Sequence, residues 1–204
     1  QERQDRPYRR PQGRRADEDR LMAAQFVTIG HSNRSLDEFL DMLRAAGVDM
    51  LIDVRRFPRS RTNPVYNIDR LPEDLARMGI DYRHCLALGG RRPRQPGVDG
   101  NLNAMWRVRS FHNYADYALG DGFATALDAL KSLGRDRRVA LMCSEAVWWR
   151  CHRRIIVDYL LLDGHAVDHL MGPGHVEHAT PTPGARKTLG GGVVYPASPS
   201  PGGV

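Results

Sequence analysis

The hydrophobic pattern between residues 26 and 54 predicts a β-α-β unit. Short apolar, β-branched runs occupy residues 26–29 and 50–54. Between them, apolar side chains recur at helical spacing over residues 36–46. Ser35 directly precedes this helix as a good N-cap residue, with Glu38 three positions further on in a capping box. The unit has the length that a right-handed parallel crossover needs.

The same alternation continues along the chain. Helical spacing predicts helices over residues 72–78, 112–118, 122–133 and 151–162, and apolar runs predict strands over residues 80–85, 139–142 and 166–170. Strands that alternate with helices favour a parallel, doubly wound sheet. We therefore expect an α/β protein with a Rossmann-like three-layer fold and a mostly parallel central sheet of about five strands.

The two ends of the chain differ from this body in composition. Residues 1–22 carry seven arginines and five acidic residues with almost no apolar side chain, and Met22 could serve as a natural start. We expect this segment to be disordered or a non-native extension. Residues 179–204 are rich in Pro, Gly, Ser and Ala, which predicts a flexible tail. The single α/β domain is therefore predicted to span residues 23–178.

The formal net charge of +6 is spread evenly between the body and the two ends. Each end carries +2, which leaves +2 for the predicted domain. An anionic partner must therefore be argued from where charges cluster and not from the total.

Cysteine usage and hydropathy bear on the compartment. Three cysteines without a signal peptide favour a reducing environment over a disulfide framework. No apolar run approaches the roughly 20 residues that cross a bilayer. We expect a cytoplasmic protein without a membrane partner.

Ligands of open parallel sheets bind at the carboxyl ends of the strands. The segments that follow the four clearest strands are residues 30–32, 53–61, 89–94 and 143–145, and they hold nearly all of the chemically interesting side chains. We expect these four loops to meet in one cleft.

Two of these loops are basic. Arginine side chains bind phosphate through paired N–H groups, so the loops predict an anion site. Its expected members are Ser32, Arg55, Arg59, Arg61, Gly89, Gly90, Arg91, Cys151, His152 and Arg153. The alternative is a solvated basic loop in an arginine-rich protein. Asp53 ends a buried strand and needs a partner, for which Arg55 is the nearest candidate.

The segment from Cys143 to Arg153 is the densest in reactive groups. Cys143 leaves a strand, and Cys151 opens a helix, whose N-terminal dipole favours anions and lowers the pKa of a thiol. We expect Glu145 to act as a general acid or base, His31 to assist it and Cys143 to be a candidate nucleophile. A buried, structural Cys143 is the alternative.

Cofactor and metal binding receive little support from these residues. Two thiols, His152 and His31 could form a metal set, but Cys-x7-Cys-His is no standard zinc spacing, so no metal is predicted. The sequence identifies no cofactor.

At these positions the sequence resembles the family described as domain of unknown function 488. The motifs that carry the resemblance are Ile29 to Ser35, Asp53 to Ser60, Leu88 to Gly90, and Cys143 and Glu145 followed by Cys151 to Arg153. The resemblance covers residues 26–171 and implies a compact α/β domain of bacterial and archaeal proteins, with no established reaction. The usual small residues before Cys-His-Arg are replaced here by Val147, Trp148 and Trp149.

Three function classes follow from this chemistry. The first is a hydrolase that acts on a phosphate-bearing substrate, a nucleotide or nucleic acid, at an N-glycosidic or phosphoester bond. The second is a thiol-dependent protein for sulfur transfer or redox chemistry that uses Cys143 and Cys151. The third is a non-catalytic module that binds nucleotides or nucleic acid.

Overall fold

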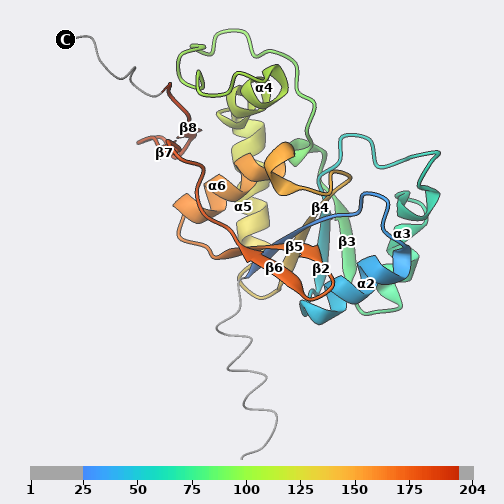
Figure 1. Ribbon diagram of the computed structural model, residues 1–204. Coiled ribbons are helices and arrows are strands. Elements are labelled where there is room, and N and C mark those ends of the chain that lie inside the picture. The colour runs from blue at the N-terminus through green and yellow to red at the C-terminus, as the bar shows by residue number, and fades with distance from the viewer. Residues whose placement is uncertain (1–24, 198–204) are drawn as a thin grey trace, which may run out of the picture.

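The computed structural model describes residues 25–197 and is built around a six-stranded sheet (Figure 1). The strands are β1 (Phe26–Gly30), β2 (Met50–Asp53), β3 (Asp81–His84), β4 (Val139–Cys143), β5 (Val167–Gly172) and β6 (His175–His178). Their order in the sheet is β3-β2-β4-β1-β5-β6, and β6 alone pairs antiparallel with its neighbour. This arrangement confirms the Rossmann-like α/β fold.

Helices cover both faces of the sheet (Figure 1). One face carries α2 (Leu36–Ala45) and α3 (Leu71–Ala76), and the other carries α4 (Arg109–Ala118), α5 (Asp121–Leu133) and α6 (Arg153–Leu162). Alternate strand positions point to opposite faces. Val27 and Ile29 therefore pack in the cluster of α2, whereas Phe26 packs in the cluster of α5 and α6.

The strand order creates a crevice beside β1. The chain leaves β1 into α2 on one face of the sheet, and it leaves β4, the neighbour of β1, into α6 on the other face. Connections that depart to opposite faces leave a hollow at the carboxyl ends of the two strands. The site is therefore positioned by topology.

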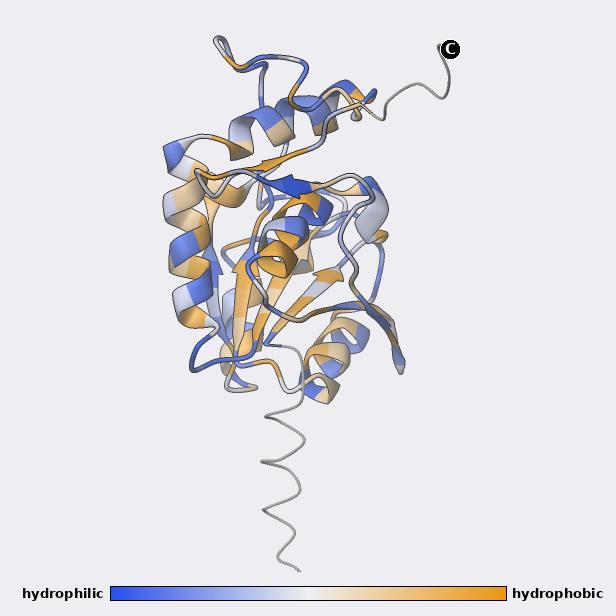
Figure 2. Cartoon of the chain, turned by 90° about the vertical axis from the view of Figure 1, so that its left-hand side faces the viewer, coloured by the Kyte–Doolittle hydropathy of each residue, from blue (hydrophilic) through white to orange (hydrophobic). Residues whose placement is uncertain are grey.

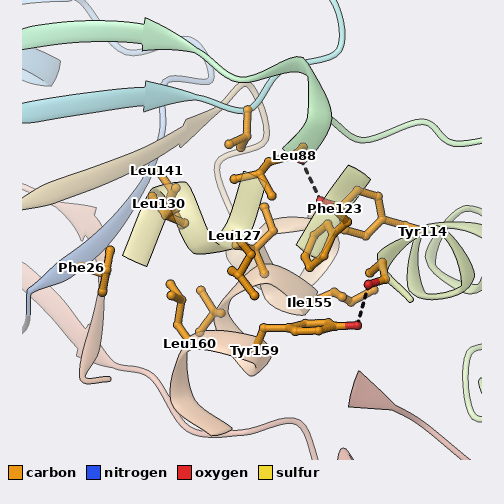
Figure 3. Close-up of a cluster of buried hydrophobic side chains, with 14 of the residues drawn as sticks. Phe26, Leu88, Tyr114, Phe123, Leu127, Leu130, Leu141, Ile155, Tyr159 and Leu160 are labelled. Carbon is orange, nitrogen blue, oxygen red and sulfur yellow. Dashed lines mark hydrogen bonds between the residues drawn. The ribbon is translucent and has the colours of Figure 1, made fainter. Parts of the chain in front are cut away.

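The core combines apolar packing with satisfied hydroxyl groups. The interior strands β1, β2 and β4 are buried and hydrophobic over most of their length, while the surrounding helices alternate in hydropathy (Figure 2). On the α5 side, the hydroxyl of Tyr114 donates to the carbonyl of Leu88 (2.7 Å) and that of Tyr159 to the carbonyl of Ala118 (2.8 Å; Figure 3). Buried hydroxyls with such partners cost little.

Most predicted helices lie within a few residues of the observed ones. The Ser35 hydroxyl accepts the backbone N–H of Glu38 at 3.2 Å, as the capping pattern predicts. The last helix differs, because it begins at Arg153 and not at Cys151. A 3-10 turn, η3 (Trp148–Arg150), precedes it, and Cys151 is extended with φ −120° and ψ 145°. Cys151 therefore lies before the helix.

Residues 179–197 differ from the predicted flexible tail, because they pack on the domain. They include the short paired strands β7 (Arg186–Lys187) and β8 (Val193–Val194). Tyr195 is fully buried, and its hydroxyl donates to Asp158 Oδ2 at 2.8 Å. The backbone N–H of Thr182 donates to Asp158 Oδ1 at 2.7 Å. Composition suggested a loose tail because its few anchoring side chains are diluted by Pro and Gly.

The edge strand β6 and the N-terminal segment also bear on the predictions from sequence. The antiparallel β6 was not predicted, because its side chains are mostly exposed and polar. The predicted extension, residues 1–22, lies outside the described residues. Among residues 25–197, no helix is long and apolar enough to cross a membrane.

The packing of the C-terminal segment predicts the effect of removing one hydroxyl. Tyr195→Phe deprives the buried Asp158 carboxylate of a partner, so the free energy of unfolding should fall by about 1–3 kcal/mol. Urea denaturation followed by circular dichroism measures this change. Leu189→Ala, at a fully exposed position, is the control and should change stability by less than about 0.5 kcal/mol. Equal stabilities of the two variants would contradict the docking of this segment.

Candidate functional site

A cleft of about 710 Å³ opens at the carboxyl ends of β1, β2 and β4. Ten of the predicted site residues line it: His31, Ser32, Arg55, Arg59, Gly90, Arg91, Cys143, Glu145, Cys151 and His152. The other three, Arg61, Gly89 and Arg153, are not among the lining residues. The loops that sequence analysis grouped together therefore meet in space.

Two glycines permit this close approach. A Cβ atom on Gly30 would lie 2.0 Å from the carbonyl oxygen of Glu145, and one on Gly90 would lie 2.7 Å from Nδ1 of His152. Both distances are far below a normal contact. The loops after β1 and β4, and the loop that contains Gly90, can come together only because these side chains are absent.

The cleft also contains strained backbone. Within residues 25–197, the residues other than glycine with positive φ are Ser32 (46°) and Arg91 (53°), and both line the cleft. Such a conformation costs on the order of 1–3 kcal/mol and is typical of functional sites. The surrounding contacts must hold these two residues in place.

A buried ion pair forms one wall. Arg55 Nε donates to both carboxylate oxygens of Asp53 (2.9 and 3.1 Å), and Nη2 donates to Oδ2 at 2.6 Å. Nη2 also donates to the carbonyl of Tyr66 at 2.7 Å, and the Tyr82 hydroxyl donates to Asp53 Oδ2 at 2.7 Å. This confirms the predicted partner of Asp53. Arg55 has little donor capacity left for an external anion.

His31 is held as a neutral ring. Its Nδ1 lies 3.0 Å from the carbonyl of Ser32, which can only accept, and its Nε2 lies 3.3 Å from Arg55 Nη1, which can only donate. Burial, and then the charge of Arg55, lower the pKa of His31 to about 4. Both ring nitrogens are engaged in these contacts. The geometry therefore favours a structural role for His31, linking the loops after β1 and β2, over the proton-transfer role expected from sequence.

A cluster of two thiols, an imidazole and a guanidinium lies beside this wall. Arg153 Nε donates to the Sγ of Cys151 at 3.3 Å, and Arg153 Nη2 donates to the carbonyl of Glu145 at 2.5 Å. His152 Nδ1 lies 3.6 Å from the same sulfur. The ligand atoms of Cys143, Cys151 and His152 all lie within 4.8 Å of one another. Arg153 is only 1% exposed, so its charge acts on the sulfur with little screening.

The two thiols differ in acidity. Burial raises the pKa of Cys151, but the hydrogen bond from Cys143 and the charge and hydrogen bonds of Arg153 outweigh it and lower the pKa. The same hydrogen bond, together with burial, raises the pKa of Cys143. These opposite pKa shifts favour the negative charge on Cys151, beside Arg153, with Cys143 as its hydrogen-bond donor, and not on Cys143, the nucleophile expected from sequence.

Two proton-transfer groups face the cleft. His152 Nε2 donates to the carbonyl of Val54 at 3.0 Å, which leaves Nδ1 directed at the Cys151 sulfur. Glu145 is exposed on the cleft wall, and its carboxylate forms no ion pair or hydrogen bond with any described residue. Both are therefore available to a bound substrate.

The same thiol cluster has the composition of a soft-metal site. Two sulfurs and one imidazole nitrogen suit Zn²⁺ with a fourth position open to the cleft, and the hydrogen bond from His152 Nε2 to the Val54 carbonyl would orient the ring for this. The cysteine spacing predicts no metal, and the structure does not bring His31 into this group. Arg153 already supplies positive charge at the Cys151 sulfur, against which a cation would have to compete.

Several lining residues had not been predicted. Arg56 and Arg150 line the cleft without an ion pair to a described residue, whereas Arg59 pairs with Asp69 at 2.8 Å on the surface. Ser110 and Phe111 come from the first turn of α4. This helix does not follow a strand, so the rule that places sites at strand ends gave no signal for it.

The cleft defines the class of this protein: a Rossmann-like α/β domain with a thiol pair and arginines at the carboxyl ends of parallel strands. The model of the family described as Domain of unknown function DUF488 matches residues 35–160, and the chain belongs to this family. The match includes the Asp53–Ser60, Leu88–Gly90 and Cys143–Arg153 segments and confirms the resemblance. The searches found no similar curated protein and no similar solved structure.

The thiol pair predicts how alkylation depends on pH. The rate of Cys151 alkylation by iodoacetamide should rise with a midpoint well below the ordinary thiol value of about 8.5. Cys143→Ala removes the S–H donor and should move this midpoint upward, whereas Cys143→Ser keeps a hydroxyl donor and should stay closer to wild type. Peptide mass spectrometry separates Cys151 from Cys85, whose substitution by Ser is the control. An unchanged midpoint in Cys143→Ala would rule out the shared proton.

The buried histidines predict a loss of stability in acid. Burial also lowers the pKa of His169, whose ring stacks on Trp148, to about 3. A lowered folded-state pKa means that the unfolded chain takes up the proton first, so the free energy of unfolding falls as pH drops from about 6.5 toward 4. Each of His31 and His169 contributes up to about 3 kcal/mol. His169→Phe should flatten the slope relative to wild type, and parallel urea titrations at pH 7 and 4.5 measure it; identical slopes would contradict this account.

Proposed function

We propose that this protein is an enzyme that binds a phosphate-bearing substrate in the cleft and attacks it with the sulfur of Cys151. The observation that carries the proposal is the position of this sulfur: it lies 3.3 Å from Arg153 Nε and 3.6 Å from His152 Nδ1, in the wall of a basic cleft. A positioned cation and an adjacent base are two of the means by which proteins activate a thiol.

The charge of the cleft supports an anionic substrate. Arg56, Arg91 and Arg150 line it, and none of them forms an ion pair with a described residue. Guanidinium groups bind phosphate oxygens through paired N–H donors. Glu145 is the lining carboxylate, and it is placed to accept from a hydroxyl or amino group of the substrate.

The chemistry that fits this arrangement is phosphoester hydrolysis in two steps. Cys151 attacks phosphorus as the thiolate, and Nδ1 of His152 holds its proton. An S–P bond forms, the ester P–O bond breaks, and the leaving oxygen takes the proton from His152. Water, deprotonated by His152, then attacks phosphorus; a P–O bond forms, the S–P bond breaks, and phosphate leaves, which restores the Cys151 thiolate with the proton on His152. The N-glycosidic alternative has less support, because it does not use the sulfur.

The thiol pair also favours a second candidate function. Cys143 and Cys151 are close enough to exchange a proton, and closely spaced thiols of unequal acidity are typical of redox and sulfur-transfer proteins. In that case both sulfurs are essential. In the hydrolase Cys143 only assists.

Substitution of the two cysteines distinguishes these functions. With p-nitrophenyl phosphate and a panel of nucleoside phosphates as probes, Cys151→Ser should lower turnover by at least about 10²-fold, and Cys143→Ser by much less. Both variants should retain affinity for inorganic phosphate, measured by calorimetry. Cys85→Ser should match wild type, and assays with and without EDTA test a metal contribution.

The outcomes separate the three classes. A phosphoryl mass gain on Cys151 in rapidly quenched samples would support the hydrolase. Equal loss in both cysteine variants, with activity toward thiosulfate or hydrogen peroxide, would favour thiol redox or sulfur transfer. Phosphate binding without turnover of any probe would leave the binding module.

A further inference from the structure

A second hollow adjoins the cleft and is not used by the proposed reaction. Its volume is about 720 Å³, and it lies against the first turns of α4. Arg109 and His112 line this hollow, whereas Ser110 and Phe111, between them in the chain, line the first cleft. The two hollows therefore share one wall. Each is as large as an ordinary small-ligand pocket.

The shared wall is aromatic. Phe111, which lines the first cleft, stacks on Trp106, which lines the second, with ring centroids 4.9 Å apart and planes at 15°. Phe57, on the loop after β2, is 64% exposed at the first cleft, and Arg91 lies 6.0 Å from its ring centroid. Phe57 belongs to neither hydrophobic core cluster, whereas Phe111 is partly buried and packs against the cluster that contains Trp106.

The second hollow is also basic. Arg94, Arg107 and Arg109 line it, all are exposed, and none forms an ion pair or hydrogen bond with a described residue. Its lining carboxylate, Asp116, is 5% exposed and already accepts from Asn103 at 2.8 Å. His112 Nε2 lies 3.5 Å from the same carboxylate. The three arginine charges are therefore not neutralised within this wall.

Both hollows thus combine aromatic side chains with arginines that have no carboxylate partner. Six arginines without carboxylate partners among the described residues line them, namely Arg56, Arg91, Arg94, Arg107, Arg109 and Arg150. Other arginines, such as Arg77 and Arg137, pair with surface carboxylates. A single mononucleotide would contact one hollow only. A ligand with several phosphates and several flat rings would contact both.

We propose that the two hollows form one track for a single-stranded nucleic acid, whose phosphates contact the arginines and whose bases stack on Phe57 and Phe111. Proteins that bind single strands without sequence preference typically combine a basic groove with aromatic stacking surfaces. Bases must be unpaired to reach such surfaces, so a duplex fits less well. This track rests on the proposed function, because one phosphate of the strand would be the group that Cys151 attacks. It adds that the substrate is a single-stranded nucleic acid.

Binding of labelled oligonucleotides tests the track without turnover. The full chain carrying Cys151→Ser is titrated with fluorescent oligothymidylates of increasing length and with a labelled duplex, and anisotropy is measured over a salt series. Affinity should rise with length beyond a mononucleotide and exceed that for the duplex. The slope of log K against log salt should be about −0.7 for each phosphate contacted.

Arginine variants locate the strand. Arg107→Ala with Arg109→Ala should make the salt slope shallower by about 1.4 and lower oligonucleotide affinity about tenfold or more. Turnover of a small phosphoester by the protein with native Cys151 should remain unchanged in this double variant. Arg135→Ala is the matched control, because Arg135 is exposed and unpaired among described residues but precedes the amino end of β4, whereas the cleft lies at the carboxyl ends of the strands. Phe57→Ala should lower oligonucleotide affinity at least about fivefold.

The results separate this proposal from the preceding one. Affinity that does not depend on strand length, a preference for duplex, or equal affinities of the arginine double variant and Arg135→Ala would overturn the track. If oligonucleotides bind as expected but Cys151→Ser retains turnover, only the hydrolase proposal fails. If Cys151→Ser abolishes turnover but no oligonucleotide binds, only the track fails.

Discussion

The buried pair of Asp53 and Arg55 is the interaction on which the cleft depends. A carboxylate at the end of a central strand is tolerable only with a partner, and breaking such a pair typically costs about 3–5 kcal/mol. Arg55 in turn donates to the Tyr66 carbonyl and to His31. One compensated charge thereby fixes the loops after β1 and β2. The geometry of the cleft is a consequence of satisfying Asp53.

The charges around the Asp53–Arg55 pair then determine where negative charge is stable in the cleft. Arg153, almost completely buried, lies against the Cys151 sulfur, while Arg56, Arg91 and Arg150 in the cleft form no ion pair with a described residue. The same positive field that favours the thiolate also favours an anionic ligand. In the proposed reaction, binding of the phosphate and activation of the sulfur are therefore two effects of one electrostatic arrangement.

The strained and glycine positions show that this arrangement is preorganised. Ser32 and Arg91 adopt positive φ in the cleft wall, and Gly30 and Gly90 allow backbone and ring atoms to approach where a Cβ would collide. The wide hydrophobic contact of the sheet with its helices supplies the stability that offsets these local costs. The fold and the cleft are thus coupled energetically.

The sequence alone determined the β-α-β periodicity, the Ser35 cap and the Asp53–Arg55 pairing, because each of these depends on residues near one another in the chain. It also determined which loops after the strands line the cleft, because this follows from the general topology of parallel sheets. Tertiary structure decided that the pKa of Cys151 is lowered while that of Cys143 is raised, and that His31 is engaged at both nitrogens. It also decided that Tyr195 docks the C-terminal segment and that α4 lies between two hollows. These properties depend on distances between residues far apart in the chain, since pKa values and hydrogen-bond partners are set by spatial neighbours, which no local pattern encodes.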